Sequence, residues 1–131
     1  MKLTKQNHEA CLNVIKLLHK IIDNNLPYSQ RVIYQEKSSV NGLITDWDTL
    51  VISGKISCLM GYLLADDKFK ESGGTVTSYD ILTFNGKDGA DGFDEYVGFN
   101  AIEIVSRGYV KSAKLALDWF VDAYAKELKL L

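Results

Sequence analysis

His8 and Cys11 are the two side chains whose types and spacing could support nucleophilic chemistry. They stand three residues apart in a segment with helical periodicity, so the side chains would be close enough to touch. A histidine activates a cysteine thiol when a third group orients the imidazole ring, and no such group accompanies this pair. Cys11 also belongs to the apolar stripe of its segment. The pattern therefore favours a core cysteine beside a surface histidine, and no catalytic residue is predicted.

An acidic, glycine-rich stretch, NGKDGADG at residues 85–92, could instead bind a cation. An EF-hand loop needs oxygen ligands at its first, third and fifth positions, glycine at the sixth and glutamate at the twelfth. Loops starting at Asn85 or Asp88 both fail, because alanine, glycine or lysine stands where a ligand is required. We therefore expect no metal site. The stretch is predicted to be an exposed loop in which Asp91 caps the following helix.

Gly54 and Lys55 resemble part of a phosphate-binding loop. That loop requires Ser or Thr directly after the lysine and a second glycine five residues before the first. Ile56 and Thr49 occupy those two positions. The sequence therefore predicts no nucleotide cofactor, and no other cofactor motif is found.

The composition is that of an ordinary globular domain. The 131 residues are 47% hydrophobic and 24% charged, and a chain of this length fits one domain, expected to span residues 1–131. Lys and Arg number 15 against 17 Asp and Glu, a net charge of −2 that argues against a basic surface for nucleic acid. No apolar run approaches the roughly 20 residues of a membrane span, and the N-terminus lacks the apolar centre of a secretory signal. We expect a cytoplasmic protein that binds neither membrane nor nucleic acid.

Helical periodicity dominates the chain and predicts an all-α fold of five or six helices. Apolar residues recur at helical spacing over residues 4–24, 91–108 and 109–128. A capping box at Thr45 predicts the start of a central helix that runs to Phe69. Small residues at four-residue spacing within it would let another helix approach closely. This small-residue ridge consists of Ser53, Ser57, Gly61 and Ala65.

Three segments leave a strand open as the alternative to a helix. Residues 28–40 and 75–84 contain β-branched and aromatic residues, and the run TLVISGKISCL could form a strand pair around Gly54. Length and the small-residue ridge favour a helix for that run. A helix is also favoured for residues 28–40, whereas residues 75–84 fit a short helix or a single strand equally well.

Acidic residues gather in one part of the chain although the net charge is small. Residues 85–96 contain four acids and one base, a local charge of 1 − 4 = −3. Such a patch would steer association with a basic partner, and a solvated loop without a partner is the alternative. Three aromatic residues beside polar segments could present their rings at an interface, or could be half-buried boundary residues. The predicted partner-binding residues are Asp88, Asp91, Asp94, Glu95, Tyr96, Trp47 and Tyr28.

In size, mild acidity and its local acidic patch, the chain resembles bacterial immunity proteins of contact-dependent growth inhibition or colicin-like systems. The resemblance is one of type and rests on no shared motif. It implies a non-catalytic protein in a tight one-to-one complex with a basic nuclease toxin, whose lysines or arginines face the acids of residues 88–95. Two other functions stay open. The chain could be a small helical enzyme or ligand-binding domain with His8, Cys11 or His19 in a pocket, or an oligomeric module that self-associates through the small-residue ridge.

Overall fold

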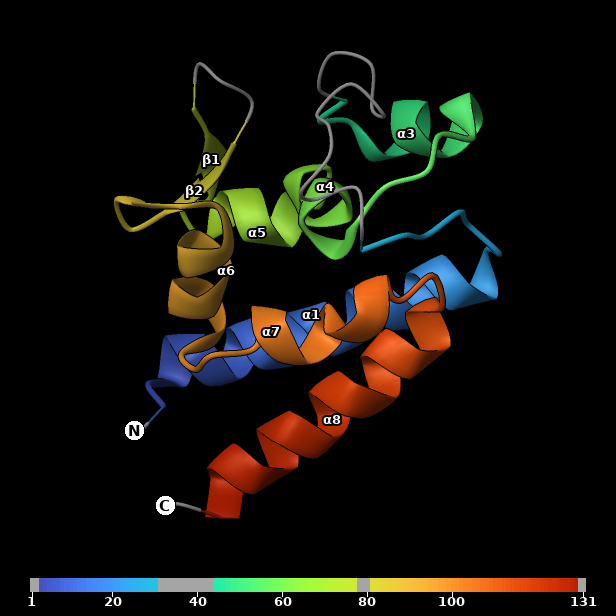
Figure 1. Ribbon diagram of the computed structural model, residues 1–131. Coiled ribbons are helices and arrows are strands. Elements are labelled where there is room, and N and C mark those ends of the chain that lie inside the picture. The colour runs from blue at the N-terminus through green and yellow to red at the C-terminus, as the bar shows by residue number, and fades with distance from the viewer. Residues whose placement is uncertain (1–2, 31–43, 78–80, 130–131) are drawn as a thin grey trace.

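The computed structural model describes residues 3–30, 44–77 and 81–129 and shows a mostly helical molecule with one small sheet (Figure 1). Its elements are α1 (Lys5–Asp23), α3 (Trp47–Ser53), α4 (Leu59–Leu64), α5 (Asp67–Glu71), β1 (Thr75–Val76), β2 (Leu82–Phe84), β3 (Lys87–Asp88), α6 (Gly89–Val97), α7 (Ile102–Val105), the short 3-10 helix η2 (Arg107–Tyr109) and α8 (Ala113–Lys129). The described residues thus form seven α-helices, more than the five or six expected.

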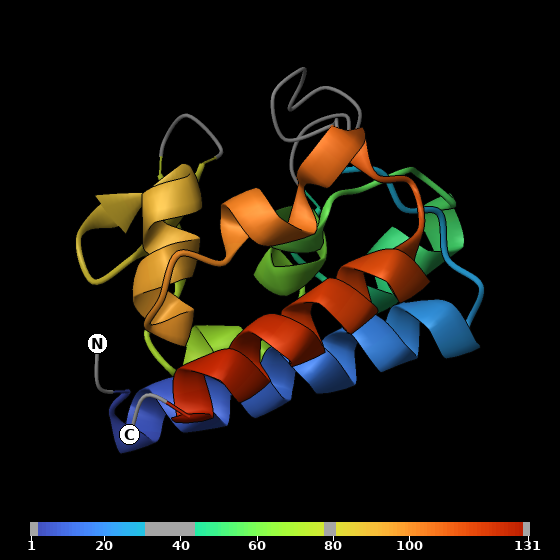
Figure 2. The ribbon, with the colours of Figure 1, turned by 60° about the horizontal axis from the view of Figure 1, so that its bottom comes forward.

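The two long helices confirm the prediction at both ends of the chain. Helix α1 begins after Thr4, whose side chain accepts a hydrogen bond from the Asn7 backbone N–H at 3.0 Å while Asn7 bonds back to the cap. Helix α8 starts four residues later than expected and packs along α1, as both ribbon views show (Figures 1 and 2). Their facing stripes contribute much of the single buried hydrophobic cluster.

The predicted central helix over residues 45–69 is wrong, because the structure divides this segment into α3, α4 and α5. Gly54 ends α3 in a left-handed conformation with φ +64°, and extended backbone follows before Cys58 caps α4. The small-residue ridge is therefore not one surface. Ser53 is exposed at the end of α3, whereas Ser57 and Ala65 are buried shortly before and directly after α4.

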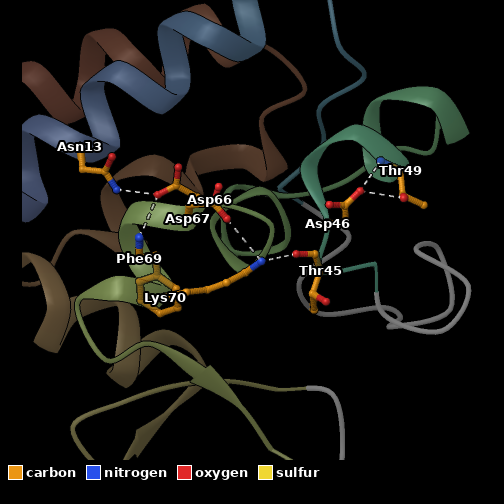
Figure 3. Close-up of polar contacts among 8 residues, drawn as sticks. All are labelled: Asn13, Thr45, Asp46, Thr49, Asp66, Asp67, Phe69 and Lys70. Carbon is orange, nitrogen blue, oxygen red and sulfur yellow. Dashed lines mark hydrogen bonds and ion pairs between the residues drawn. The ribbon is translucent and has the colours of Figure 1, made fainter.

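Helices α3 and α5 are each capped by an aspartate, and further hydrogen bonds join these segments to other parts of the fold (Figure 3). The carboxylate of Asp46, rather than Thr45, caps α3, accepting the Thr49 N–H at 2.9 Å. Asp66 caps α5 and also accepts a hydrogen bond from the side chain of Asn13 on α1 at 2.8 Å. Lys70 of α5 donates to the Thr45 carbonyl. Local hydrogen bonds of this kind compete with a continuous helix and here prevail over it.

A three-stranded antiparallel sheet, ordered β1-β2-β3, replaces part of the expected helical fold. The all-α prediction is therefore corrected to mostly helical. Residues 75–84, predicted as a short helix or a single strand, contribute to two strands instead, through residues 75–76 and 82–84, and residues 78–80 lie outside the described residues. Asn85 and Gly86 link β2 to β3 with φ values of +54° and +78°, as in the two-residue turns typical of tight hairpins. Residues 85–92 thus form a hairpin turn, a strand and a helix start, and only part of the stretch is an exposed loop.

Residues 28–40, the other segment for which helix and strand were both open, lie only partly within the described residues. Tyr28 forms an isolated parallel bridge with Ser57, and residues 31–40 lie outside the described residues. The predicted helix over residues 91–108 is divided into α6 and α7, because Gly98 ends α6 with φ +90°. None of the described helices is both long and apolar enough to cross a bilayer.

Candidate functional site

The predicted acidic patch lies on and next to helix α6, which is packed against the rest of the fold. One of its faces is buried through Gly92, Phe93, Tyr96 and Val97. At its C-terminal end, the side-chain amide of Asn7 donates to the carbonyls of Glu95 and Tyr96, at 3.3 and 3.1 Å. The opposite face is consequently held in a fixed orientation towards solvent.

That opposite face carries acids that have no basic partner. Asp88 and Asp91 are exposed and Glu95 is half-buried, and Glu103 is exposed in the first turn of α7. In residues 3–30, 44–77 and 81–129, none of these four carboxylates forms an ion pair. We call this set, Asp88, Asp91, Glu95 and Glu103, the acidic face.

Two acids of this face also have local structural roles. Asp88 precedes α6 and accepts a hydrogen bond from the Thr83 hydroxyl at 3.0 Å. The prediction that Asp91 caps this helix is wrong, because α6 begins after Asp88. Asp91 lies in the first turn of α6, where a negative charge interacts favourably with the helix dipole. Asp91 and Glu95, however, are four residues apart on one helix, a spacing at which like charges repel. Glu103 was not among the predicted residues, because only the turn between α6 and α7 brings it towards the other acids.

Asp94, predicted as a partner-binding acid, faces the fold. Its carboxylate accepts hydrogen bonds from the backbone N–H groups of Ala101 and Ile102, at 3.0 and 2.9 Å, and so connects α6 to the start of α7. Burial raises the pKa of Asp94, with the charges of Asp91 and Glu103 adding to the same effect. We assign Asp94 to the support of the acidic face.

Replacing Asp94 by alanine is expected to lower the free energy of unfolding by about 1 kcal/mol, because two N–H donors lose their acceptor.

Replacing Asp94 by asparagine keeps an acceptor oxygen and removes the charge. Because the folded-state pKa of Asp94 is raised, the stability cost of ionisation is absent below the unfolded pKa and grows as the pH rises through the folded pKa. Asp94→Asn should therefore gain stability relative to wild type between about pH 3 and pH 7. Urea unfolding at both pH values checks this, and a relative loss would contradict it.

Two of the three predicted surface aromatics are buried instead. Tyr96 is 2% exposed, meets Phe69 edge to face at 4.9 Å between ring centroids, and accepts a hydrogen bond from Asn13. Tyr28 is 7% exposed and donates to the side-chain oxygen of the buried Gln30. These hydrogen bonds satisfy the hydroxyl groups, so both rings can stay in the core.

Trp47 is half-buried and lies apart from the acidic face. It is on α3, whereas the acids are on α6 and α7, and both ribbon views separate α3 from α6 (Figures 1 and 2). Its ring packs against Tyr62 at 5.9 Å between centroids, and the Lys20 ammonium lies 3.9 Å from the centroid of the ring. The predicted combination of acids and aromatic rings on one surface is therefore not formed by these residues.

His8 and Cys11 each form a hydrogen bond with a different residue. His8 Nδ1 bonds the Tyr124 hydroxyl at 2.9 Å, which links α1 to α8. The Cys11 thiol is buried and donates to the Val97 carbonyl at 3.3 Å. This arrangement agrees with the core-cysteine interpretation of the sequence.

Both thiols are expected to be unreactive in the folded protein. Burial raises the pKa of Cys11 to about 12 and that of Cys58 to about 11, and both are free cysteines. Because the thiolate is the reactive form, an aromatic disulfide reagent at about pH 8 should label neither residue in the native state. The same reagent in denaturant should label two thiols per chain. Rapid labelling of one native thiol would show an accessible site that this fold does not contain.

No group of three or more His, Cys, Asp or Glu side chains within the described ranges is placed to hold a metal ion. Comparison with protein-family models, with curated proteins and with solved structures finds no match to this chain.

Proposed function

We propose that the chain is a non-catalytic binding protein that neutralises a basic partner through the acidic face, as immunity proteins neutralise nuclease toxins. The observation that supports this proposal is a set of four carboxylates on α6, α7 and the strand before them, with no ion pair among the described residues. The cytoplasm is the proposed compartment.

The physical case begins with the repulsion among these acids. Like charges at helical spacing cost a few tenths of a kcal/mol per pair, and a basic partner removes that cost when it binds. The same charges speed the encounter with a positively charged surface. Because Phe93 and Val97 anchor α6 in the core, the acids need no rearrangement to meet a partner. A nuclease domain, which is basic because it binds a polyanion, has the matching charge.

The alternative of an oligomeric module lacks the surface on which it depended. Ser57 is 0% exposed and Ala65 is 1% exposed, so the small-residue ridge cannot meet another chain without unfolding. The alternative of a pocket containing His8, Cys11 or His19 is weakened for the first two residues, because both side chains are hydrogen-bonded within the fold. His19 does line a pocket between α1 and α8, so this alternative stays open for His19.

A growth assay tests the proposal. The variant Asp88→Asn, Asp91→Asn, Glu95→Gln, Glu103→Gln removes four charges, while Glu9→Gln, Asp23→Asn, Asp48→Asn, Glu71→Gln removes four charges from exposed positions elsewhere. Co-expression of wild type with the product of the neighbouring gene should restore growth that this product alone inhibits. The matched control should protect equally well, and the acidic-face variant should protect poorly. Both variants should fold, because seven of the eight substituted side chains are exposed, where charges contribute little to stability, and the half-buried Glu95 forms no ion pair with a described residue.

Two outcomes would contradict the proposal. If wild type gives no protection against the neighbouring gene product, the proposed immunity function is wrong. If both variants protect as well as wild type, the acidic face is removed from the interface, and the half-buried Trp47 on α3 becomes the next candidate.

A further inference from the structure

A crevice of about 150 Å³ lies between the turn after α7 and the C-terminal half of α8. Cavities of this size hold ligands on the scale of benzene, so an open crevice fits a molecule of about six to nine non-hydrogen atoms. Its lining includes Ile104, Arg107, Trp119, Asp122, Lys126 and Glu127.

Arg107 is held beside this crevice by a buried hydrogen-bonding residue. Gln30 is 0% exposed; its side-chain amide donates to the Ser106 hydroxyl at 3.1 Å and its backbone N–H donates to the Val110 carbonyl at 2.9 Å. These two bonds hold both ends of η2, the turn that carries Arg107. The guanidinium lies over the half-buried Trp119, with its carbon 5.8 Å from the centroid of the ring. Gln30 therefore holds the turn, and the exposed Arg107 side chain extends from this turn over Trp119.

The crevice lining contains one ion pair and two further charged side chains. Lys126 and Asp122 form an ion pair at 3.0 Å and neutralise each other. Arg107 and Glu127 form no ion pair with any residue that the structure describes. Glu127 lies eight residues beyond Trp119 on α8, about 12 Å along the helix axis. The crevice lining thus includes one cation and one anion outside any ion pair of the described residues, with apolar surface from Ile104 and Trp119.

We propose that this crevice binds a small molecule that carries a carboxylate and an amine joined by an apolar body. The Arg107 guanidinium matches a carboxylate with two parallel hydrogen bonds, and the Glu127 carboxylate accepts the ammonium group. The methylene groups of the ligand pack on the Trp119 ring. This site is separate from the acidic face, none of whose four residues lines the crevice.

Titration with 6-aminohexanoate, followed by NMR of the tryptophan indole N–H signals, tests the proposal. The chain has two tryptophans, and a Trp47→Phe variant assigns the signal of Trp119. The Trp119 signal should shift saturably, with a dissociation constant of about 1 to 10 mM for a ligand of this size on an open site. Hexanoate and hexylamine, which each lack one charged group, should bind at least roughly tenfold more weakly.

Three variants assign the two ends of the ligand. Arg107→Gln should weaken 6-aminohexanoate binding roughly tenfold. Glu127→Gln should weaken 6-aminohexanoate binding by a similar factor and leave hexanoate binding unchanged. Lys111→Gln, an exposed charge change outside the crevice, should leave binding unchanged. The rest of the amide spectrum shows that each variant is folded. The proposal is overturned if the Trp119 signal does not saturate below about 50 mM, or if Arg107→Gln binds as well as Lys111→Gln.

Discussion

Gly92→Ala should lower the free energy of unfolding by about 3 kcal/mol, the upper part of the range for overpacking a core. Gly92 is buried on the face of α6 that packs against β2 and β3. A methyl group there would overlap the Lys87 carbonyl oxygen and lie 3.1 Å from Leu82 Cδ2 and 3.2 Å from the Phe84 backbone nitrogen. Two of these three atoms belong to backbone and cannot move aside. The clash therefore outweighs the roughly 1 kcal/mol by which alanine favours a helix over glycine.

Gly54→Ala is the matched control for this prediction. Gly54 has φ +64° and open space around the position of the added methyl group, so only backbone strain of about 1 kcal/mol is expected. Chemical denaturation of both variants gives the comparison. A Gly92 variant no less stable than the Gly54 variant would show that α6 does not sit this closely on the hairpin, and the support of the acidic face would be lost.

Gln30→Met should destabilise the fold by a similar amount, about 3 kcal/mol, because it leaves several buried groups without partners. The Gln30 side-chain oxygen accepts hydrogen bonds from the Tyr28 hydroxyl and from the Leu59 N–H, the latter at 2.8 Å. Its amide donates to Ser106. One buried side chain thus joins the start of α4 to the end of α7, and methionine has the size but not the hydrogen bonds.

Gln6→Met, an exposed substitution of the same type on α1, should change the unfolding free energy by less than about 0.5 kcal/mol. Adding Tyr28→Phe to Gln30→Met removes one of the orphaned hydroxyl groups, so the double variant should be more stable than the sum of the two losses. Equal losses for the Gln30 and Gln6 variants would mean that Gln30 makes no buried network.

The features that could be predicted from sequence are those set by neighbours along the chain. The apolar stripe of α1 lies within one segment, and so does the stripe of α8. The breaks at Gly54 and Gly98 were missed because apolar residues continue across both glycines, which hides the end of each helix. A glycine inside an apolar helical pattern was the available signal.

The clustering of acids over residues 85–96 is a property of the sequence, but the direction of their side chains could not be predicted from it. Asp94 turns inward because residues 101 and 102, beyond a helix end, offer two N–H donors. Tyr96 is buried because Phe69 and Asn13, both distant in the sequence, provide an aromatic contact and a hydrogen bond. Gly61 did prove to be crowded, as its predicted role in packing required, yet the neighbour is the Ser57 side chain and not another helix.

Calorimetric titration of the neighbouring gene product with wild type, the acidic-face variant and its matched control is the most direct test of the proposed function. At about 50 mM salt, removal of four interfacial charges should weaken binding roughly 100-fold, while the control binds like wild type. At about 500 mM salt, screening should reduce this difference to a few-fold. Equal affinities of the acidic-face variant and the control at low salt would contradict a docking surface formed by Asp88, Asp91, Glu95 and Glu103.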